Sequence, residues 1–273
     1  MAYEKLELLI NGKFTAGTSG KTEAVINPAT EEVLGHLPLA STADLDEAIS
    51  AACDGFKVWR ATPAVQRQQI MEKAARILED RQDEMARNLT MEMGKPVGEA
   101  KLELDFTISV LRWYAEEGKR AYGRLVPARV PGMRQMVTSE PVGPVAAFVA
   151  WNFPGVNVIR KVAGALGAGC SIVIKASEET PGTCISIARA FQDAGLPDGV
   201  LNVVFGVPDE VSRHMLADPR LRKLSFTGSV PVGKHLQKLA ADNLMRCTME
   251  LGGHSPVIVF DDADVGKAAE MAA

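Results

Sequence analysis

The sequence predicts an α/β protein whose doubly wound, mostly parallel sheet follows an N-terminal layer of helices. Two observations lead to this prediction. From residue 144 onward, short apolar runs of strand length alternate with segments of helical length. Between residues 41 and 117, in contrast, three successive segments carry apolar residues at helical spacing. Alternating strands and crossover helices build parallel sheets that are covered on both faces, so the apolar runs are expected to be buried strands.

The N-terminal part begins with a predicted hairpin and continues into three helices. Residues 8–14 contain an Asn-Gly pair between apolar residues, which is typical of a tight hairpin turn. A polar turn is expected at residues 27–31. The predicted helices begin at a Ser41 or Thr42 cap, at Thr62-Pro63 with an inner face that extends to Leu89, and at Pro96, the last running through Leu102, Phe106, Val110 and Trp113.

Residues 123–142 are punctuated by proline and glycine and differ from both neighbouring regions. Two interpretations fit this pattern about equally well. One is a protruding hairpin that takes part in oligomer contacts, and the other is an ordinary surface connection. The hairpin is the prediction adopted for this segment.

The strand–helix–strand unit after residue 143 is the centre of the predicted sheet. Residues 145–149 form a short apolar run, 156–169 are long enough for a crossover helix, and 171–174 supply the next buried strand. Asn152 and Lys175 each follow the end of one of these strands. Ligands of open α/β sheets bind outside the carboxyl ends of the strands, so these two polar residues indicate a candidate site.

The alternation continues to the end of the chain. Helices expected at 181–194, from Pro208 and at 229–241 separate strands expected at 201–205 and 221–226. The motif Thr248-Met-Glu-Leu-Gly-Gly253 leads into a predicted buried strand at 255–260, and a last helix is expected near Asp264. Because the pattern stops inside that helix, the chain is expected to be truncated.

The composition predicts a cytoplasmic globular protein and argues against several kinds of partner. Of the 273 residues, 47% are apolar and 23% are charged, as in ordinary globular domains. A net charge of −4 without a Lys/Arg cluster argues against nucleic acid. No signal peptide or membrane-spanning run is recognisable. The four cysteines lack zinc-type spacing, so free thiols in a reducing compartment and no metal site are expected.

Phe226-Thr-Gly-Ser229, with Gly233 one turn later, is the best nucleotide-binding signal in the residues themselves. The usual G-x-G-x-x-G fingerprint is absent. Here a strand ends in Thr-Gly, and Ser229 begins a helix whose free N–H groups and positive dipole end can hold a pyrophosphate. A serine that only caps the helix is the commoner alternative, and it stays open.

Four motifs, taken in order, resemble the aldehyde dehydrogenase superfamily along the whole chain. They are Trp151-Asn-Phe-Pro154, Lys175-Ala-Ser-Glu178, Phe226-Thr-Gly-Ser229 with Gly233, and Glu250-Leu-Gly-Gly253, supported by matches at residues 27–31, 94–96 and 195–202. The resemblance implies a sheet of aldehyde dehydrogenase type. It also implies NAD(P)-dependent oxidation of an aldehyde to the acid, by way of a cysteine thiohemiacetal and thioester.

The resemblance also assigns catalytic roles to two residues. Asn152 matches the family's oxyanion-hole residue, whose amide stabilises negative charge without having to ionise. Glu250 matches the general base that activates water, a role suited to a carboxylate shielded beside Met249 and Leu251. Judged from the residues alone, an Asn152 that closes a turn and a Glu250 that pairs with an arginine remain alternatives.

For the cofactor, the resemblance implies Lys175 and Glu178 at the adenosine ribose, and Gly228 and Ser229 at the pyrophosphate. A carboxylate at Glu178 can accept from both ribose hydroxyls and repels a 2′-phosphate, which favours NAD. NADP remains possible, because Lys175 can partly neutralise such a phosphate. The predicted cofactor-binding set is completed by Trp151, Gly233 and Leu251.

The family's nucleophile is a cysteine that lies downstream of the Glu-Leu-Gly-Gly motif, beyond residue 273, so the fragment alone is expected to be inactive. Cys247 lacks the family's context and is interpreted as a packed thiol, like Cys170 and Cys184. The expected organisation is an NAD(P)-binding domain at 1–122 and 143–249, an oligomerisation hairpin at 123–142, and the start of a catalytic domain at 250–273. A homodimer or homotetramer is expected at full length.

Within the family, the chain is most similar to the succinate-semialdehyde dehydrogenase branch, in which an arginine matching Arg160 holds the substrate carboxylate. Pairing of Arg160 with a neighbouring acid is an equally good interpretation. Two alternatives to the oxidation remain. One is a truncated nucleotide-binding or assembly fragment without turnover. The other is an acylating, coenzyme-A-using relative, against which the presence of Glu250 counts.

Overall fold

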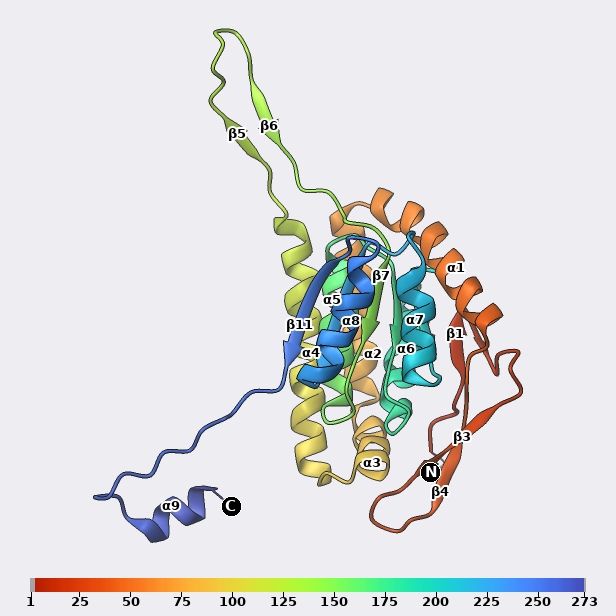
Figure 1. The fold of residues 1–273 in the computed structure, drawn as a ribbon, viewed down its shortest axis with the longest axis vertical. Coiled ribbons are helices and arrows are strands. Elements are labelled where there is room, and N and C mark those ends of the chain that lie inside the picture. The colour runs from red at the N-terminus through yellow and green to blue at the C-terminus, as the bar shows by residue number, and fades with distance from the viewer. Residues whose placement is uncertain (1–2, 273) are drawn as a thin grey trace.

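The computed structural model describes residues 3–272, and its centre is a seven-stranded sheet in the order β11-β10-β7-β8-β9-β1-β2 (Figure 1). The five parallel strands are β7 (Val145–Phe148), β8 (Ile172–Lys175), β9 (Leu201–Val204), β10 (Lys223–Gly228) and β11 (Arg246–Leu251). The antiparallel hairpin of β1 (Leu8–Ile10) and β2 (Lys13–Thr15) extends the sheet beside β9. The predicted doubly wound, mostly parallel sheet is therefore confirmed.

Helices cover both faces of this sheet (Figure 1). One face carries α5 (Pro154–Gly167) and α6 (Pro181–Ala194), with α2 (Ala64–Asp80), α3 (Gln82–Met93) and α4 (Val97–Glu117) packed outside them. The other face carries α1 (Thr42–Ala61), α7 (Pro208–Ala217) and α8 (Val230–Ala241). The short 3-10 helix η1 (Gly118–Arg120) continues α4. The predicted helical layer thus lies on both sides of the sheet.

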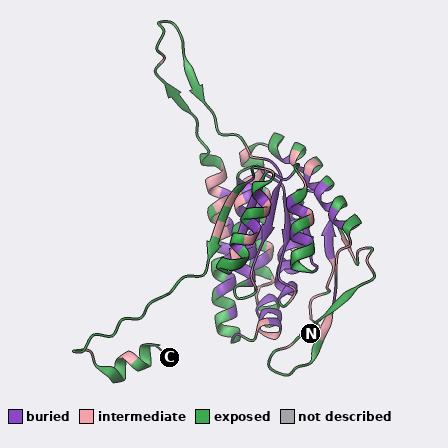
Figure 2. Cartoon of the chain, viewed as in Figure 1, coloured by how far each residue is buried: buried purple, intermediate pink, exposed green. Residues whose placement is uncertain are grey.

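The core lies between the sheet and its inner helices, where Figure 2 shows almost continuous burial. All residues of β7, β8 and β9 are buried, as expected for strands covered on both faces. Trp59 of α1 is fully buried, and its indole N–H donates to the carbonyl of Leu166 at 2.9 Å. This bond satisfies the polar end of a large core side chain.

The N-terminal hairpin turns at Asn11 and Gly12, which have φ values of 50° and 75°. Asparagine and glycine are the residues that tolerate this left-handed pair, so the prediction of a tight turn is confirmed. A second antiparallel pair, β3 (Thr22–Ile26) and β4 (Val33–Pro38), was not predicted. The expected polar turn at 27–31 connects these two strands.

Two features of the helices differ from the expectation. The helix that starts after Pro63 ends at Asp80, and a break at Arg81 separates it from α3, so the single helix expected to reach Leu89 is wrong. In α4, the apolar residues that identified the helix lie on its outer side: Leu102, Phe106 and Trp113 are exposed, whereas Leu104, Ile108 and Leu111 are buried against its neighbours.

Residues 123–142 form the protruding hairpin (Figure 1). Its strands, β5 (Arg124–Val126) and β6 (Gln135–Val137), pair only with each other and are exposed along their whole length. The structure thus favours the hairpin over an ordinary surface connection. Its use in oligomer contacts stays a prediction.

The predicted buried strand at residues 255–260 is wrong. These residues form no strand and are exposed; Val257 and Phe260 retain 74% and 72% of their accessible surface. A strand needs a neighbour for its backbone groups, and β11 already occupies the place beside β10 with residues of the Glu-Leu motif. The last helix, α9 (Val265–Ala272), begins where expected, and Asp264 accepts from the amide of Lys267 at 3.2 Å.

Within residues 3–272, every helix is too short or too polar to cross a bilayer.

Candidate functional site

The candidate site lies at the edge of the sheet where β7, β8, β10 and β11 end. The chain runs from β7 through β8 to β9 in one direction and then returns to β10 on the other side of β7. The connections after β7 and β10 therefore diverge, which is the position where open α/β sheets bind ligands. Trp151 and Asn152 follow β7, and Ser229 follows β10.

A pocket of about 540 Å³ opens at this edge and is lined by Asn152, Arg160 and Glu250. We call it the Asn152 pocket. Trp151, Gly228, Ser229 and Leu251 are also among its lining residues. The two residues predicted to be catalytic, Asn152 and Glu250, thus share one cavity, although they lie far apart in the sequence.

The side-chain amide of Asn152 is oriented by a neighbour on α5. Its Oδ1 accepts from Nδ2 of Asn157 at 3.3 Å, and the same Nδ2 donates to the carbonyl of Ala150 at 3.4 Å. Asn152 itself is exposed. Because this bond uses the acceptor atom of the amide, the Nδ2 donor of Asn152 remains available to a ligand.

Glu250 lies in β11 opposite Thr227 of β10 and is exposed. The expected shielding by Met249 and Leu251 is wrong, because adjacent residues of a strand point to opposite faces of the sheet. Leu251 instead packs on α8: a Cβ placed on Gly233 would lie 2.7 Å from its Cδ2. The carboxylate of Glu250 is therefore open to the pocket and to water.

A buried lysine that the sequence reasoning missed lies close to Glu250. Lys161 of α5 is 8% exposed, and its ammonium group donates to the carbonyl of Phe226 at 3.5 Å. Burial lowers the pKa of Lys161, while the negative charge of Glu250 acts in the opposite direction. The sequence feature that could have identified Lys161 is its position directly after Arg160, in a helix that is otherwise apolar at this point.

Arg160 is exposed and lines the Asn152 pocket. Its guanidinium carbon lies 5.6 Å from the centre of the Phe106 ring on α4. Of the two sequence interpretations, pairing with a neighbouring acid is not observed among the described residues. The aromatic contact leaves the hydrogen-bond donors of the guanidinium edge for another group.

A second pocket, of about 460 Å³, adjoins the first and shares Ala150, Trp151, Thr227, Gly228 and Ser229 with it. We call it the Glu178 pocket. Asp209 and His235, which the sequence reasoning did not identify, also line it. The two pockets form one elongated concavity along the sheet edge.

Lys175 and Glu178 form an ion pair within the Glu178 pocket, with side chains that are 7% and 10% exposed. The other carboxylate oxygen of Glu178 accepts from the amide of Gly206 at 3.0 Å. The carboxylate of Glu178 thus keeps a largely buried position at the end of β8. The positive charge of Lys175 and the negative charge of Glu178 compensate each other there.

The N-terminus of α8 points its first amides toward this concavity. Ser229 is the N-cap residue, and its side chain makes no capping hydrogen bond. The free N–H groups and the positive end of the helix dipole suit an anion. Gly233, by contrast, is buried against Leu251 and lines neither pocket, so its closeness to β11 gives it a packing role.

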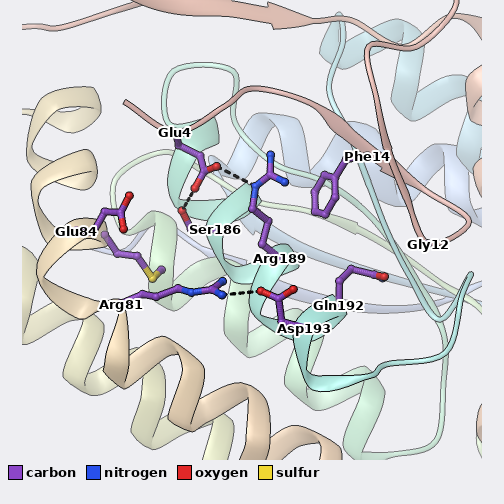
Figure 3. A pocket seen from close by; sticks show the side chains of 10 residues that line it. Glu4, Gly12, Phe14, Arg81, Glu84, Ser186, Arg189, Gln192 and Asp193 are labelled. Atoms are coloured by element: carbon purple, nitrogen blue, oxygen red, sulfur yellow. Dashed lines mark hydrogen bonds and ion pairs between the residues drawn. The ribbon is translucent and has the colours of Figure 1, made fainter. Parts of the chain in front are cut away.

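Another cavity, of about 480 Å³, lies between α6, the start of α3 and the N-terminal segment (Figure 3). Its charged residues are largely paired with each other: Arg81 with Asp193 at 2.6 Å, and Glu4 with Arg189 at 2.9 Å. The first pair attaches the start of α3 to α6, and the second attaches the N-terminal segment to α6.

Comparison with known proteins identifies the family. Residues 14–273 match the sequence profile of the aldehyde dehydrogenase family. A 4-(hydroxymethyl)benzenesulfonate dehydrogenase of Comamonas testosteroni is 46% identical over 98% of this chain and 56% of the relative. The NADP-dependent succinate-semialdehyde dehydrogenase of Escherichia coli is 40% identical over 97% of this chain and 55% of the relative.

Solved structures agree with this result. A succinate-semialdehyde dehydrogenase from Burkholderia pseudomallei superposes with a TM-score of 0.94 at 41% identity, covering 98% of this chain and 55% of that one. A betaine aldehyde dehydrogenase from Staphylococcus aureus in complex with NAD+ gives 0.94 at 31% identity, covering 98% and 54%. The chain spans about half the length of these relatives. It belongs to the aldehyde dehydrogenase family.

Proposed function

We propose that the protein containing this chain oxidises an aldehyde to the corresponding acid, with a nicotinamide dinucleotide as the hydride acceptor. The observation that carries the proposal is the shared concavity: Asn152 and Glu250 line one pocket, which is continuous with the pocket of the Lys175–Glu178 pair. Because the relatives are about twice as long as this chain, the activity is proposed for the full-length protein.

The residues of the Glu178 pocket fit a dinucleotide. Glu178 offers a carboxylate that can accept hydrogen bonds from ribose hydroxyls, and the first turn of α8 after Ser229 offers amide donors for the pyrophosphate. Bound NAD would supply the hydride acceptor. We propose NAD rather than NADP, because the carboxylate of Glu178 repels a 2′-phosphate, whereas Lys175 is already engaged by Glu178.

In the reaction, Asn152 donates its Nδ2 hydrogens to the oxygen that becomes negative when a nucleophile adds to the aldehyde. Glu250 takes a proton from the water that releases the acid. We propose that the nucleophile is a cysteine of the segment that follows residue 273. Cys247 lies in β11 and does not line the Asn152 pocket, and Cys170 and Cys184 are buried, in keeping with packing roles.

The proposed substrate is an aldehyde that carries a carboxylate, such as succinate semialdehyde. Arg160 places a guanidinium at the Asn152 pocket, where it can hold an anion in its two-pronged geometry. Several relatives are named for anionic substrates, including a glutarate-semialdehyde dehydrogenase at 41% identity and a 3-sulfolactaldehyde dehydrogenase at 41%. We further propose a cytoplasmic location, in which the four thiols stay reduced.

The test is an assay of the full-length protein for reduced nicotinamide in the presence of succinate semialdehyde. We expect turnover with NAD and a loss of about 100-fold to 1,000-fold in the Asn152→Ala variant. The alternative is a nucleotide-binding or assembly fragment without turnover. The coding sequence beyond Ala273 distinguishes the two, since the oxidation requires a cysteine motif there.

A further inference from the structure

The start of α5, directly after the loop that carries Asn152, is capped by a residue of another helix. Glu103 of α4 has a side chain that is only 1% exposed. Its Oε1 accepts from the backbone amides of Gly155 at 2.8 Å and Val156 at 3.4 Å. The N-cap residue Phe153 supplies no side-chain bond, so the carboxylate of Glu103 satisfies first-turn amides that would otherwise lack a partner.

Lys95 contacts the residue that lies between Asn152 and the start of α5. Its ammonium group forms an ion pair with the second oxygen of Glu103 and lies 4.2 Å from the centre of the Phe153 ring. The Lys95 side chain is only 7% exposed, whereas Phe153 retains 49% of its accessible surface, so a largely buried cation contacts a half-exposed ring. Phe153 and the first turn of α5 that follows it are thus both attached to the Lys95–Glu103 ion pair.

The approach of α4 to α5 allows little movement at this point. A Cβ on Gly155 would lie 2.7 Å from the hydroxyl oxygen of Thr107 and 3.3 Å from Oε1 of Glu103. A side chain at position 155 would push against Thr107 and Glu103. Glycine therefore allows Glu103 to approach the backbone amides closely enough for its hydrogen bonds. The backbone that follows Asn152 is therefore defined by α4 rather than by the loop itself.

Asn157, one turn into α5, determines which end of the Asn152 amide faces the pocket. It is 8% exposed, and its Nδ2 joins Asn152 Oδ1 to the carbonyl of Ala150, as described above. Its own backbone amide donates to the carbonyl of Phe153 at 2.8 Å. Without the side chain of Asn157, the Asn152 amide would lose the bond that distinguishes its oxygen from its nitrogen.

We propose that Glu103 and Asn157 are positioning residues for Asn152. Glu103 fixes the backbone of the loop through the start of α5, and Asn157 orients the amide so that its N–H donors face the Asn152 pocket. Neither residue lines that pocket, so both act through Asn152. A donor that is held in place before the reaction needs no reorganisation when charge develops. This inference rests on the proposed function.

The test is a double-mutant cycle in the full-length enzyme, with the single-turnover rate of hydride transfer and the NAD dissociation constant as readouts. We expect Asn157→Ala and Glu103→Gln each to lower the rate by about tenfold, less than the loss on removing Asn152 itself, with unchanged NAD affinity. In the Asn152→Ala background, neither substitution should lower the rate further. Glu99→Gln, an exposed change one turn earlier on α4, should behave like the wild type.

Two results would overturn the inference: no loss of rate in Asn157→Ala, or the same fractional loss with and without Asn152. If Glu103→Gln does not fold, Asn157→Ala decides, because it keeps the Glu103–Lys95 pair. Failure of the proposed function looks different. In that case the wild-type enzyme oxidises no aldehyde, or Asn152→Ala is as fast as the wild type.

Discussion

Lys161 and Glu250 place opposite charges at the end of the sheet, one buried in α5 and the other open to the Asn152 pocket. Their interaction is electrostatic, and Glu250 counteracts the lowering of the Lys161 pKa that burial causes. The carboxylate of Glu250 is exposed and keeps access to water, as its proposed role requires.

Replacement of Glu250 by Gln should therefore separate the two halves of the proposed reaction. The first hydride transfer should remain largely intact, because Asn152 and the Glu178 pocket are unchanged. Release of the acid should slow by about 100-fold, since an amide cannot take a proton from water. The measurement is a rapid burst of reduced nicotinamide followed by a slow steady state. A steady-state rate equal to that of the wild type would remove Glu250 from the mechanism.

Replacement of Arg160 by Ala should affect anionic substrates selectively. We expect kcat/KM for succinate semialdehyde to fall by about 10-fold to 100-fold, the effect of losing a charged hydrogen bond. An uncharged aldehyde of similar length serves as the internal control and should lose much less. Equal losses for both substrates would show that Arg160 matters for packing on Phe106 rather than for anion recognition.

Replacement of Glu178 by Gln should shift the choice of cofactor. The substitution removes the negative charge that repels a 2′-phosphate and releases Lys175 from its ion pair. We expect the ratio of kcat/KM for NADP to that for NAD to rise by about tenfold. Glu210→Gln, an exposed change on α7 that does not line the Glu178 pocket, is the matched control and should leave the ratio at its wild-type value. An unchanged ratio in Glu178→Gln would place the adenosine ribose elsewhere.

The fold could be predicted wherever local pattern and tertiary environment agree. Strands β7, β8 and β9 are apolar runs because both of their faces are buried. In contrast, β3 and β11 are mostly exposed and carry charged residues, so neither strand contains an apolar run that would predict it. The apolar run at residues 255–260 looked more like a strand than β11 does. A run of this kind does not reveal whether a neighbouring strand exists to pair with it.

The site could be predicted where it depends on motifs, but not where it depends on packing between distant segments. Asn152 and Glu250 were found by motif, and the sheet brings them to one pocket. Glu103 reaches the start of α5 only because α4 packs on that helix, and nothing in its own neighbourhood indicates this contact. Asn157 was missed for a similar reason, because its partner is defined by the conformation of the loop.

The protruding hairpin leads to a prediction about assembly. Leu125 and Met136 are directly opposite each other on β5 and β6, and both are more than 70% exposed. Exposed apolar pairs of this kind are typical of surfaces that another subunit covers. We expect the double substitution Leu125→Glu and Met136→Glu to shift the full-length protein toward monomer in sedimentation velocity. The melting temperature of the monomeric core should not change, because β5 and β6 pair only with each other and both substituted side chains are exposed. An unaltered sedimentation coefficient would argue against the hairpin as an interface.

The N-terminus of α1 gives a prediction for stability against pH. Asp44 and the N-cap residue Ser41 form a capping box, and Asp44 also accepts from the amide of Thr18 at 3.0 Å. Burial by itself would raise the pKa of Asp44, but the hydrogen bonds from Thr18 and Ser41 outweigh it and lower the pKa below the ordinary value of 3.8.

A carboxyl group whose pKa is lower in the folded state stabilises the protein above its unfolded pKa, and this contribution disappears as the pH falls through the folded value. We therefore expect Asp44→Asn to reduce the free energy of unfolding by about 2 kcal/mol at pH values well above 3.8, measured by urea denaturation. The difference from the wild type should shrink as the pH falls below 3.8, because Asp44 is protonated first in the unfolded state and then, at its lower pKa, in the folded state. Glu47→Gln, an exposed change on the same helix, controls for the loss of a charge. A difference that stays constant across this range would mean that the capping geometry, and not the charge of Asp44, provides the stabilisation.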